Sequence, residues 1–310
     1  AAGDAGPTRT LYTFEKGWKF TRSDQADFTR LDCDDSSWQS VTVPHDWAVY
    51  GPFSIQNDRQ KVAITQDGQK EAMEHAGRTG GLPFVGVGWY RLDFEVPASD
   101  RSKKATLVFD GAMSHARVYI NGKEAGYWPY GYNTFYLDVT PYLNAGGKNI
   151  MAVRLENDVE SSRWYPGAGL YRNVHLIVNE DVHIPMWGTQ LSTPVVKNDF
   201  ARVRLNTSLV MPEGKSSSSY RIVTEIKNAV GSGVCKGEKQ LTDFDGQTFS
   251  QEFVVEKPEL WTPDAPYLYT AESKVYEGNV VKDESVTPFG IRSIEIIPKK
   301  GFCLNGKTTV

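Results

Sequence analysis

The stretch ARVYING, residues 116–122, carries the two signals that decide the fold. Ala116, Val118 and Ile120 alternate with Arg117 and Tyr119, which is the period-two pattern of a strand with one buried face. Asn121-Gly122 follows directly, and this pair suits the left-handed positions of a two-residue turn. The stretch therefore predicts two antiparallel strands joined by a tight hairpin.

The same alternation recurs along the chain, and it predicts an all-β protein made of sandwiches or barrels. Four further sets of apolar residues each share one face of an expected strand: Val174, Leu176 and Val178; Val203, Leu205 and Leu209; Tyr220, Ile222 and Ile226; and Phe249, Phe253 and Val255. No long segment repeats apolar residues at helical spacing. A short helix is expected near Gln69–Ala76, and one helical turn within residues 138–143.

A change of composition near residue 180 predicts two domains. Most tryptophans precede it, whereas a Ser-rich tip and longer polar segments follow it. We place the boundary at Asn179-Glu180-Asp181, with a jelly roll over residues 11–180 and an immunoglobulin-like sandwich of about seven short strands over 181–297. Residues 1–10 are small and polar and are expected to form a disordered leader, so that a periplasmic or secreted location is favoured.

Composition excludes several kinds of function. The formal net charge of −4 and the absence of a Lys/Arg run predict no nucleic-acid partner and no anionic membrane surface. No apolar stretch approaches the roughly 20 residues that span a bilayer. The cysteines, Cys33, Cys235 and Cys303, lie far apart, and the histidines lack the spacing of a metal site. No metal or other cofactor is identified.

The densest polar and aromatic stretch, ENDVESSRWYPGAGLYRNV (156–174), holds the candidate binding residues. Asn157 and Asp158 follow an apolar run at an expected strand end, where functional loops often begin. Arg163, Trp164 and Tyr165 precede a Pro-Gly-Ala-Gly loop. A ring beside guanidinium and hydroxyl groups suits a sugar contact, because the ring stacks on C–H groups. The alternative is that Trp164 and Tyr165 only pack against the core. Asp34-Asp35, by contrast, is expected to be a solvated turn.

Long motifs in fixed order resemble the N-terminal region of glycoside hydrolase family 2. In the first domain they are VPHDW (43–47), GVGWYRLDFEVP (86–97), VYINGKEAGY (118–127), FYLDVTPYLNAGGKNIMAVRLEN (135–157) and SSRWYPGAGLYRNVHL (161–176). In the second they are PELWTPDAPYLYT (258–270) and FGIRSIEI (289–296). The SSRWYPGAGLYR segment is typical of bacterial β-galactosidases, and β-glucuronidases and β-mannosidases share the architecture.

The resemblance implies a galactose-binding-like jelly roll, an immunoglobulin-like sandwich and then a (β/α)₈ barrel. KKGFCLNGKTTV (299–310) is similar to the hairpin that leads into that barrel. Residues 298–310 are thus expected to be a truncated lead-in to an absent catalytic barrel. The family's two catalytic glutamates lie in the barrel, so no catalytic residue is expected in this chain, which is expected to be inactive alone.

By the same resemblance, Asn157, Asp158, Arg163, Trp164 and Tyr165 are expected to line the substrate cleft of a retaining β-galactosidase-like enzyme. The implied partners are a β-galactoside, bound through the full-length enzyme, and the chain's own C-terminal barrel. A homo-oligomer is also compatible with the family. Ca²⁺ or other metal sites occur in some relatives, and a structural Ca²⁺ or Mg²⁺ in the parent enzyme is left open, but no motif here fixes a metal. The alternatives are a free-standing carbohydrate-binding protein and an interaction module without a ligand.

Overall fold

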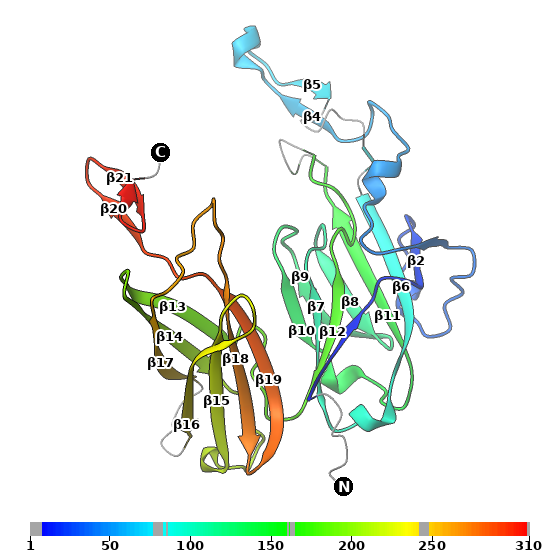
Figure 1. Ribbon diagram of the computed structural model, residues 1–310. Helices are drawn as coiled ribbons and strands as arrows, with labels where there is room; N and C mark the ends of the chain where they lie inside the picture. Colours follow the sequence, from blue (N-terminus) through cyan, green and yellow to red (C-terminus); the bar gives the residue numbers. More distant parts are fainter. Residues whose placement is uncertain are drawn as a thin grey trace. The chain divides into compact units, whose positions relative to one another are not determined.

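A computed structural model describes residues 8–76, 83–84, 86–159, 161, 165–241 and 248–308 (Figure 1). The chain divides into two compact units. One spans Thr10–Val178, and the other comprises the residues from Asn179 onward together with Arg9. Both units are built of strands, and the helical elements in the described residues are short 3₁₀ turns. The predicted fold class, a jelly-roll sandwich followed by an immunoglobulin-like sandwich, is confirmed.

The first unit packs a four-stranded sheet against a six-stranded sheet. The smaller sheet has the order β1 (Arg9–Thr13), β12 (Val174–Asn179), β7 (Lys104–Phe109) and β10 (Phe135–Asp138). The larger has the order β3 (Gln39–Val41), β2 (Trp18–Thr21), β6 (Gly86–Val96), β11 (Gly147–Asn157), β8 (Ala116–Ile120) and β9 (Lys123–Trp128). Three-ten turns join them: η1 (Ala26–Thr29), η2 (Trp47–Tyr50), η4 (Ala98–Asp100) and η5 (Thr140–Tyr142).

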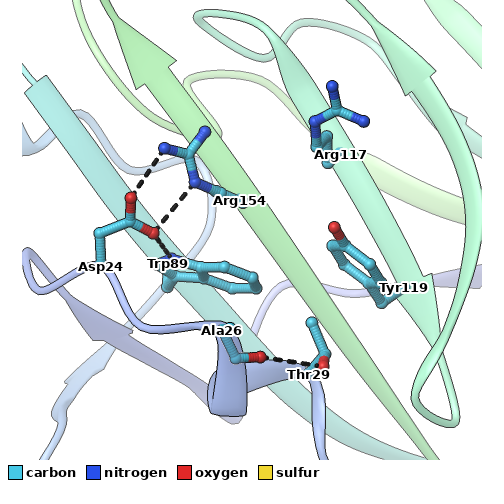
Figure 2. Close-up of a pocket in the computed structure, with 7 residues that line it drawn as sticks. All are labelled: Asp24, Ala26, Thr29, Trp89, Arg117, Tyr119 and Arg154. Carbon is cyan, nitrogen blue, oxygen red and sulfur yellow. Dashed lines mark hydrogen bonds and ion pairs between the residues drawn. The ribbon is translucent and has the colours of Figure 1, made fainter.

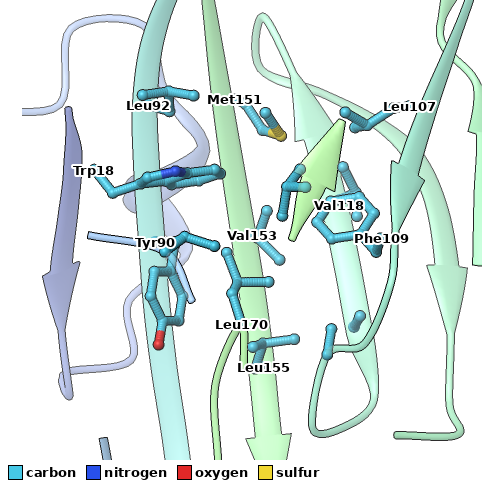
Figure 3. Packing of buried hydrophobic residues seen from close by; sticks show 14 of the residues in the cluster. Trp18, Tyr90, Leu92, Leu107, Phe109, Val118, Met151, Val153, Leu155 and Leu170 are labelled. Carbon is cyan, nitrogen blue, oxygen red and sulfur yellow. The ribbon is translucent and has the colours of Figure 1, made fainter. Parts of the chain in front are cut away.

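The core of the first unit lies between the two sheets (Figure 3). Strands β6 and β11 pair antiparallel along their whole length, from Gly147 opposite Val96 to Asn157 opposite Gly86. Their inward side chains, including Tyr90, Val153 and Leu155, are fully buried. The alternating residues of ARVYING behave as predicted, since all three apolar members are buried. Outward side chains of the same strands are thereby placed on the opposite face of the sheet.

The Asn121-Gly122 hairpin is confirmed, and its asparagine does more than close the turn. Asn121 and Gly122 both have positive φ, 52° and 80°, as a type I′ turn requires. The Asn121 side chain accepts a hydrogen bond from the Ile150 backbone N–H and donates to the carbonyl oxygen of Tyr142. The turn is thus fastened to the start of strand β11.

The second unit has two sheets of the immunoglobulin-like type. One has the order β13 (Thr189–Val196), β14 (Phe200–Ser208) and β17 (Thr248–Glu256). The other has the order β16 (Gly233–Gln240), β15 (Tyr220–Lys227), β18 (Tyr269–Glu277) and β19 (Val280–Phe289), with η6 (Ser217–Ser219) before β15. The apolar faces predicted for residues 203–209, 220–226 and 249–255 are all buried.

A third small sheet follows β19, with the order β20 (Ile294–Ile297), β21 (Gly301–Leu304) and β22 (Lys307–Thr308). Asn305-Gly306 forms the expected turn, with φ of 50° and 76°. The boundary that we placed between residues 297 and 298 falls inside this sheet, because β20 pairs with β21.

Several local predictions were wrong. Residues 69–76 form no helix, because Met73–Ala76 (β5) pairs with Arg59–Val62 (β4), with η3 (Thr65–Asp67) between them. A short helix without a buried apolar face is unstable in water, and the strand pairing satisfies the hydrogen-bonding groups of the backbone instead.

Two further predictions need correction. Arg9 lies in β1 although we assigned it to a leader; residues 1–7 lie outside the described part. Asp35 is not simply solvated, since its Oδ2 is 2.9 Å from Nε of the buried Arg91.

Asp283 on β19 is a buried anchor within the second unit. Its carboxylate is fully buried and accepts hydrogen bonds from Arg9 Nε and Nη2, at 3.2 and 2.8 Å, and from the Ile184 backbone N–H at 2.7 Å. Arg9 Nη2 also donates to the Ile184 carbonyl oxygen. A buried charge is tolerated because it is paired and fully hydrogen-bonded.

Replacing Asp283 by Ala should lower the free energy of unfolding of the second unit by about 2–4 kcal/mol, because the Ile184 N–H and the Arg9 guanidinium lose their acceptor. Urea unfolding followed by Trp261 fluorescence checks this. The matched control is Glu284→Ala, which removes an exposed ion pair with Lys274 and should cost less than about 1 kcal/mol. Equal losses for the two variants would contradict the anchor role.

Candidate functional site

The Asp46 carboxylate organises one end of the first unit. Its Oδ1 accepts from the backbone N–H of Ala48 at 3.0 Å and of Ala168 at 2.9 Å. Its Oδ2 accepts from the Tyr165 hydroxyl at 2.7 Å. The first contact caps the start of η2, where an acidic side chain is favoured. The other two hold the loop that contains Tyr165 and Ala168.

Backbone hydrogen bonds attach this loop, residues 165–170, on both of its sides. The N–H groups of His45 and Trp47 donate to the carbonyl oxygens of Leu170 and Ala168, at 2.7 and 3.0 Å. Met113 and Gly169 exchange two hydrogen bonds at 3.0 and 3.1 Å. Asn157 lies at the end of β11, is 1% exposed, and donates from Nδ2 to the Gly167 carbonyl oxygen. The loop is therefore held by three separate segments.

Gly169 is required by the close approach of the loop to the core. Its φ is 114°, a conformation that other residues rarely adopt. A Cβ at this position would lie 2.4 Å from the Tyr90 hydroxyl oxygen and 2.6 Å from the His45 carbonyl oxygen. The glycine thus allows the loop to lie directly on the His45–Tyr90 pair.

His45 and Tyr90 form a buried neutral pair beneath the loop. His45 Nδ1 is 2.7 Å from the Tyr90 hydroxyl, and the His45 ring stacks on Tyr50. Burial is the main cause that lowers the pKa of His45 below its usual 6.5 and that raises the pKa of Tyr90 well above 10.0. Both groups are uncharged near neutral pH, so their contact does not require a buried ion.

The structure gives the predicted site residues different positions. Tyr165 is 43% exposed and reaches Asp46, and burial followed by the Asp46 hydrogen bond raises its pKa, so the hydroxyl stays protonated. Asp158 is exposed, with Oδ2 3.4 Å from Nε2 of His115. Asn157 is buried and contacts the loop backbone. Arg163 and Trp164 lie outside the described residues.

The sequence reasoning missed Asp46 and His45, although both lie in the quoted motif VPHDW. Asp46 could have been found as an acidic residue directly before an aromatic turn, which is an N-cap signal. Its second role, at Ala168 and Tyr165, depends on pairing between segments more than 100 residues apart.

The segment shortly after Asp46 exposes apolar side chains. Four of them are more than half exposed: Val49, Tyr50, Phe53 and Ile55.

Among the described residues, no group of three or more His, Cys, Asp or Glu side chains could hold a metal ion. In the same part of the chain, no helix is both long enough and apolar enough to cross a membrane. Fold and site together define a protein of two β-sandwich domains. In the first domain, polar contacts fix the loop at residues 165–170 and leave Tyr165 at its start partly exposed.

The chain belongs to family 2 of the glycosyl hydrolases. Residues 13–179 match the model of its sugar binding domain, described as "Glycosyl hydrolases family 2, sugar binding domain", and residues 182–292 match "Glycosyl hydrolases family 2". The expected family is thereby confirmed for both units.

Known relatives extend the match across the chain. It is 35% identical over 299 residues to the beta-galactosidase BoGH2A of Bacteroides ovatus, covering 96% of this chain and 33% of the relative. It is 31% identical to a putative beta-glucuronidase of Formosa agariphila, covering 95% and 26%. A solved family 2 structure from Bacteroides cellulosilyticus superposes with a TM-score of 0.85 at 31% identity, covering 96% and 37%. The chain thus spans about a third of the length of such relatives.

The pKa of His45 is near 6.5 in the unfolded chain and lower in the folded chain. As pH falls below 6.5, the unfolded chain therefore takes up a proton first, and the folded state should lose stability. The stability that neutral His45 contributes to the folded state is fully present above pH 6.5. An NMR titration of the His45 ring checks the sign, and we expect a midpoint below 6.5. A midpoint at or above this value would contradict the buried neutral pair.

Proposed function

We propose that this chain is the non-catalytic N-terminal portion of a retaining β-galactosidase-like glycosidase. In that enzyme the two sandwiches support a (β/α)₈ barrel, and the loop at residues 165–170 lines one side of the substrate cleft. The observation that carries the proposal is the fixation of this loop by Asp46 with the Tyr165 ring still accessible. Asp158, directly after β11, is also exposed. The chain aligns with about a third of the length of its family 2 relatives, and this supports the proposal.

The role proposed for the loop is positioning of the substrate. Asp46 and Asn157 hydrogen-bond to the loop, and the bond between Asp46 and the Tyr165 hydroxyl holds the ring in one orientation. An aromatic ring of this kind can cover the apolar face of a sugar, and Asp158 can accept from a hydroxyl. A loop ordered before binding loses less entropy on contact with substrate, and orientation contributes several kcal/mol to catalysis.

The chemical step is assigned to the barrel. In retaining glycosidases two carboxylates about 5 Å apart act as nucleophile and as acid/base. In the described part of this chain, the Asp46 carboxylate instead accepts hydrogen bonds from the chain's own backbone and from Tyr165. Asp46 is therefore proposed as a positioning residue.

The exposed apolar residues after Asp46 support the scaffolding part of the proposal. Val49 and Tyr50 lie in η2, and Phe53 and Ile55 follow it closely. Patches of apolar surface commonly mark protein interfaces. We propose that the barrel covers these side chains in the full-length enzyme. The chain alone should then associate with itself at high concentration.

A β-glucuronide is the second candidate for the substrate, because several relatives carry the name beta-glucuronidase. One solved structure of that activity also superposes on this chain with a TM-score of 0.80 at 27% identity. The β-galactoside remains the first candidate because of the Bacteroides ovatus relative.

Tyr165→Phe in the full-length enzyme should lower kcat/KM on a chromogenic β-galactoside about tenfold, since the ring is no longer held in one orientation by its hydrogen bond to Asp46. The matched control is Tyr12→Phe, which removes another tyrosine–aspartate contact, that with Asp100, and should leave kcat/KM within about twofold. The same assay on a β-glucuronide decides between the substrates. Equal effects of the two variants would contradict the proposed role of the loop.

A further inference from the structure

An open pocket of about 480 Å³ lies on the outer face of the six-stranded sheet (Figure 2). Its walls come from β6, β8, β11 and the segment around η1: Asp24, Ala26, Thr29, Trp89, Arg117, Tyr119 and Arg154. Strand alternation places Trp89, Tyr119 and Arg154 here, because their neighbours Tyr90, Val118 and Val153 face the core. None of the lining residues belongs to the loop at 165–170 or to its supports.

Each charged side chain of the pocket is paired, either with another lining residue or with a glutamate outside the lining. Arg154 donates to both Asp24 oxygens, at 3.0 and 2.8 Å, and to Glu156 at 2.9 Å. Arg117 donates to Glu124 at 3.1 Å. The Arg154 hydrogen bond is the main cause that lowers the pKa of Asp24, so the carboxylate stays ionised. A charged ligand would have to compete with these internal partners, whereas a neutral polar ligand would not.

Rigid aromatic groups complete the pocket. The Trp89 indole donates to Asp24 at 2.8 Å, and its ring stacks on Tyr119 with centroids 5.9 Å apart. Figure 2 shows Tyr119 and Arg117 on one side of the pocket and Trp89, Arg154 and Asp24 on the other. Burial raises the pKa of Tyr119, which keeps its hydroxyl available as a donor. Within the described residues this hydroxyl has no hydrogen-bond partner in the protein.

We propose that this pocket binds a neutral sugar residue, with hydroxyls bonded by Tyr119, Arg117 and Asp24 and with the sugar's C–H face against the Tyr119 ring. A sugar has several hydrogen-bond donors and acceptors but no net charge. The paired side chains of the pocket can hydrogen-bond to such a ligand without losing their own ion pairs. The volume suits one or two hexose rings, given that ligand sites measure about 300–1,000 Å³. Only the choice of galactose as first probe rests on the proposed function.

An NMR titration of the 310-residue chain with methyl β-galactoside and methyl β-glucoside tests the site. We expect saturable shifts of the Trp89 indole N–H and the Arg154 Nε–H, with a Kd of about 1–10 mM for at least one probe. Absence of saturation for both probes would overturn the proposal. Saturable shifts confined to His45 and Tyr165 would also overturn it, while leaving the proposed function of the loop intact.

Variants and a charged probe sharpen the test. Tyr119→Phe retains the ring stacking and should weaken binding about threefold to tenfold, and Arg117→Met about tenfold. Tyr12→Phe, at a tyrosine outside the pocket, is the control and should leave Kd unchanged. Tighter binding of methyl β-glucuronide than of methyl β-glucoside would contradict a site for neutral sugars. Unchanged affinity in both pocket variants would place the sugar elsewhere.

Discussion

The site at the end of the first unit depends on the Asp46 carboxylate. One side chain caps η2, accepts from Ala168 and holds the Tyr165 hydroxyl. The surrounding structure is arranged to permit this: Gly169 lets the loop approach the His45–Tyr90 pair, and Asn157 binds the Gly167 carbonyl from β11. Because a carboxylate that accepts several hydrogen bonds is well compensated, it can order a loop without a large cost of desolvation.

Strands β6, β8 and β11 give the first unit two different surfaces. Their inward side chains form the core (Figure 3), and their outward side chains form the pocket of Figure 2. The end of β11 supports the loop through Asn157. One set of strands therefore serves stability, the loop and the pocket. A substitution in the core, such as one at Val153, should affect the neighbouring outward residue Arg154 through the shared backbone.

Much of the fold was predictable from local pattern, because alternation and the Asn-Gly turns act over a few residues. The hairpin at Asn121-Gly122 and the buried faces in both units followed from them. Pairing between distant segments was not predictable: Met73–Ala76 became a strand through Arg59–Val62, and Asp35 found the buried Arg91. The site shows the same limit. Asn157, Asp158 and Tyr165 were selected by composition, whereas Asp46 and the Asp24–Arg154 pair depend on contacts between distant parts of the chain.

Amide hydrogen exchange of the Asp46→Ala chain tests the central role of this carboxylate most directly. The informative amides are Trp47 and Gly169, which donate to backbone carbonyls and not to Asp46 itself. If Asp46 holds the loop, their exchange should accelerate about tenfold or more, with the β6–β11 amides unchanged and with Asp158→Ala as a silent control. Unchanged protection of Trp47 and Gly169 in Asp46→Ala would contradict the account.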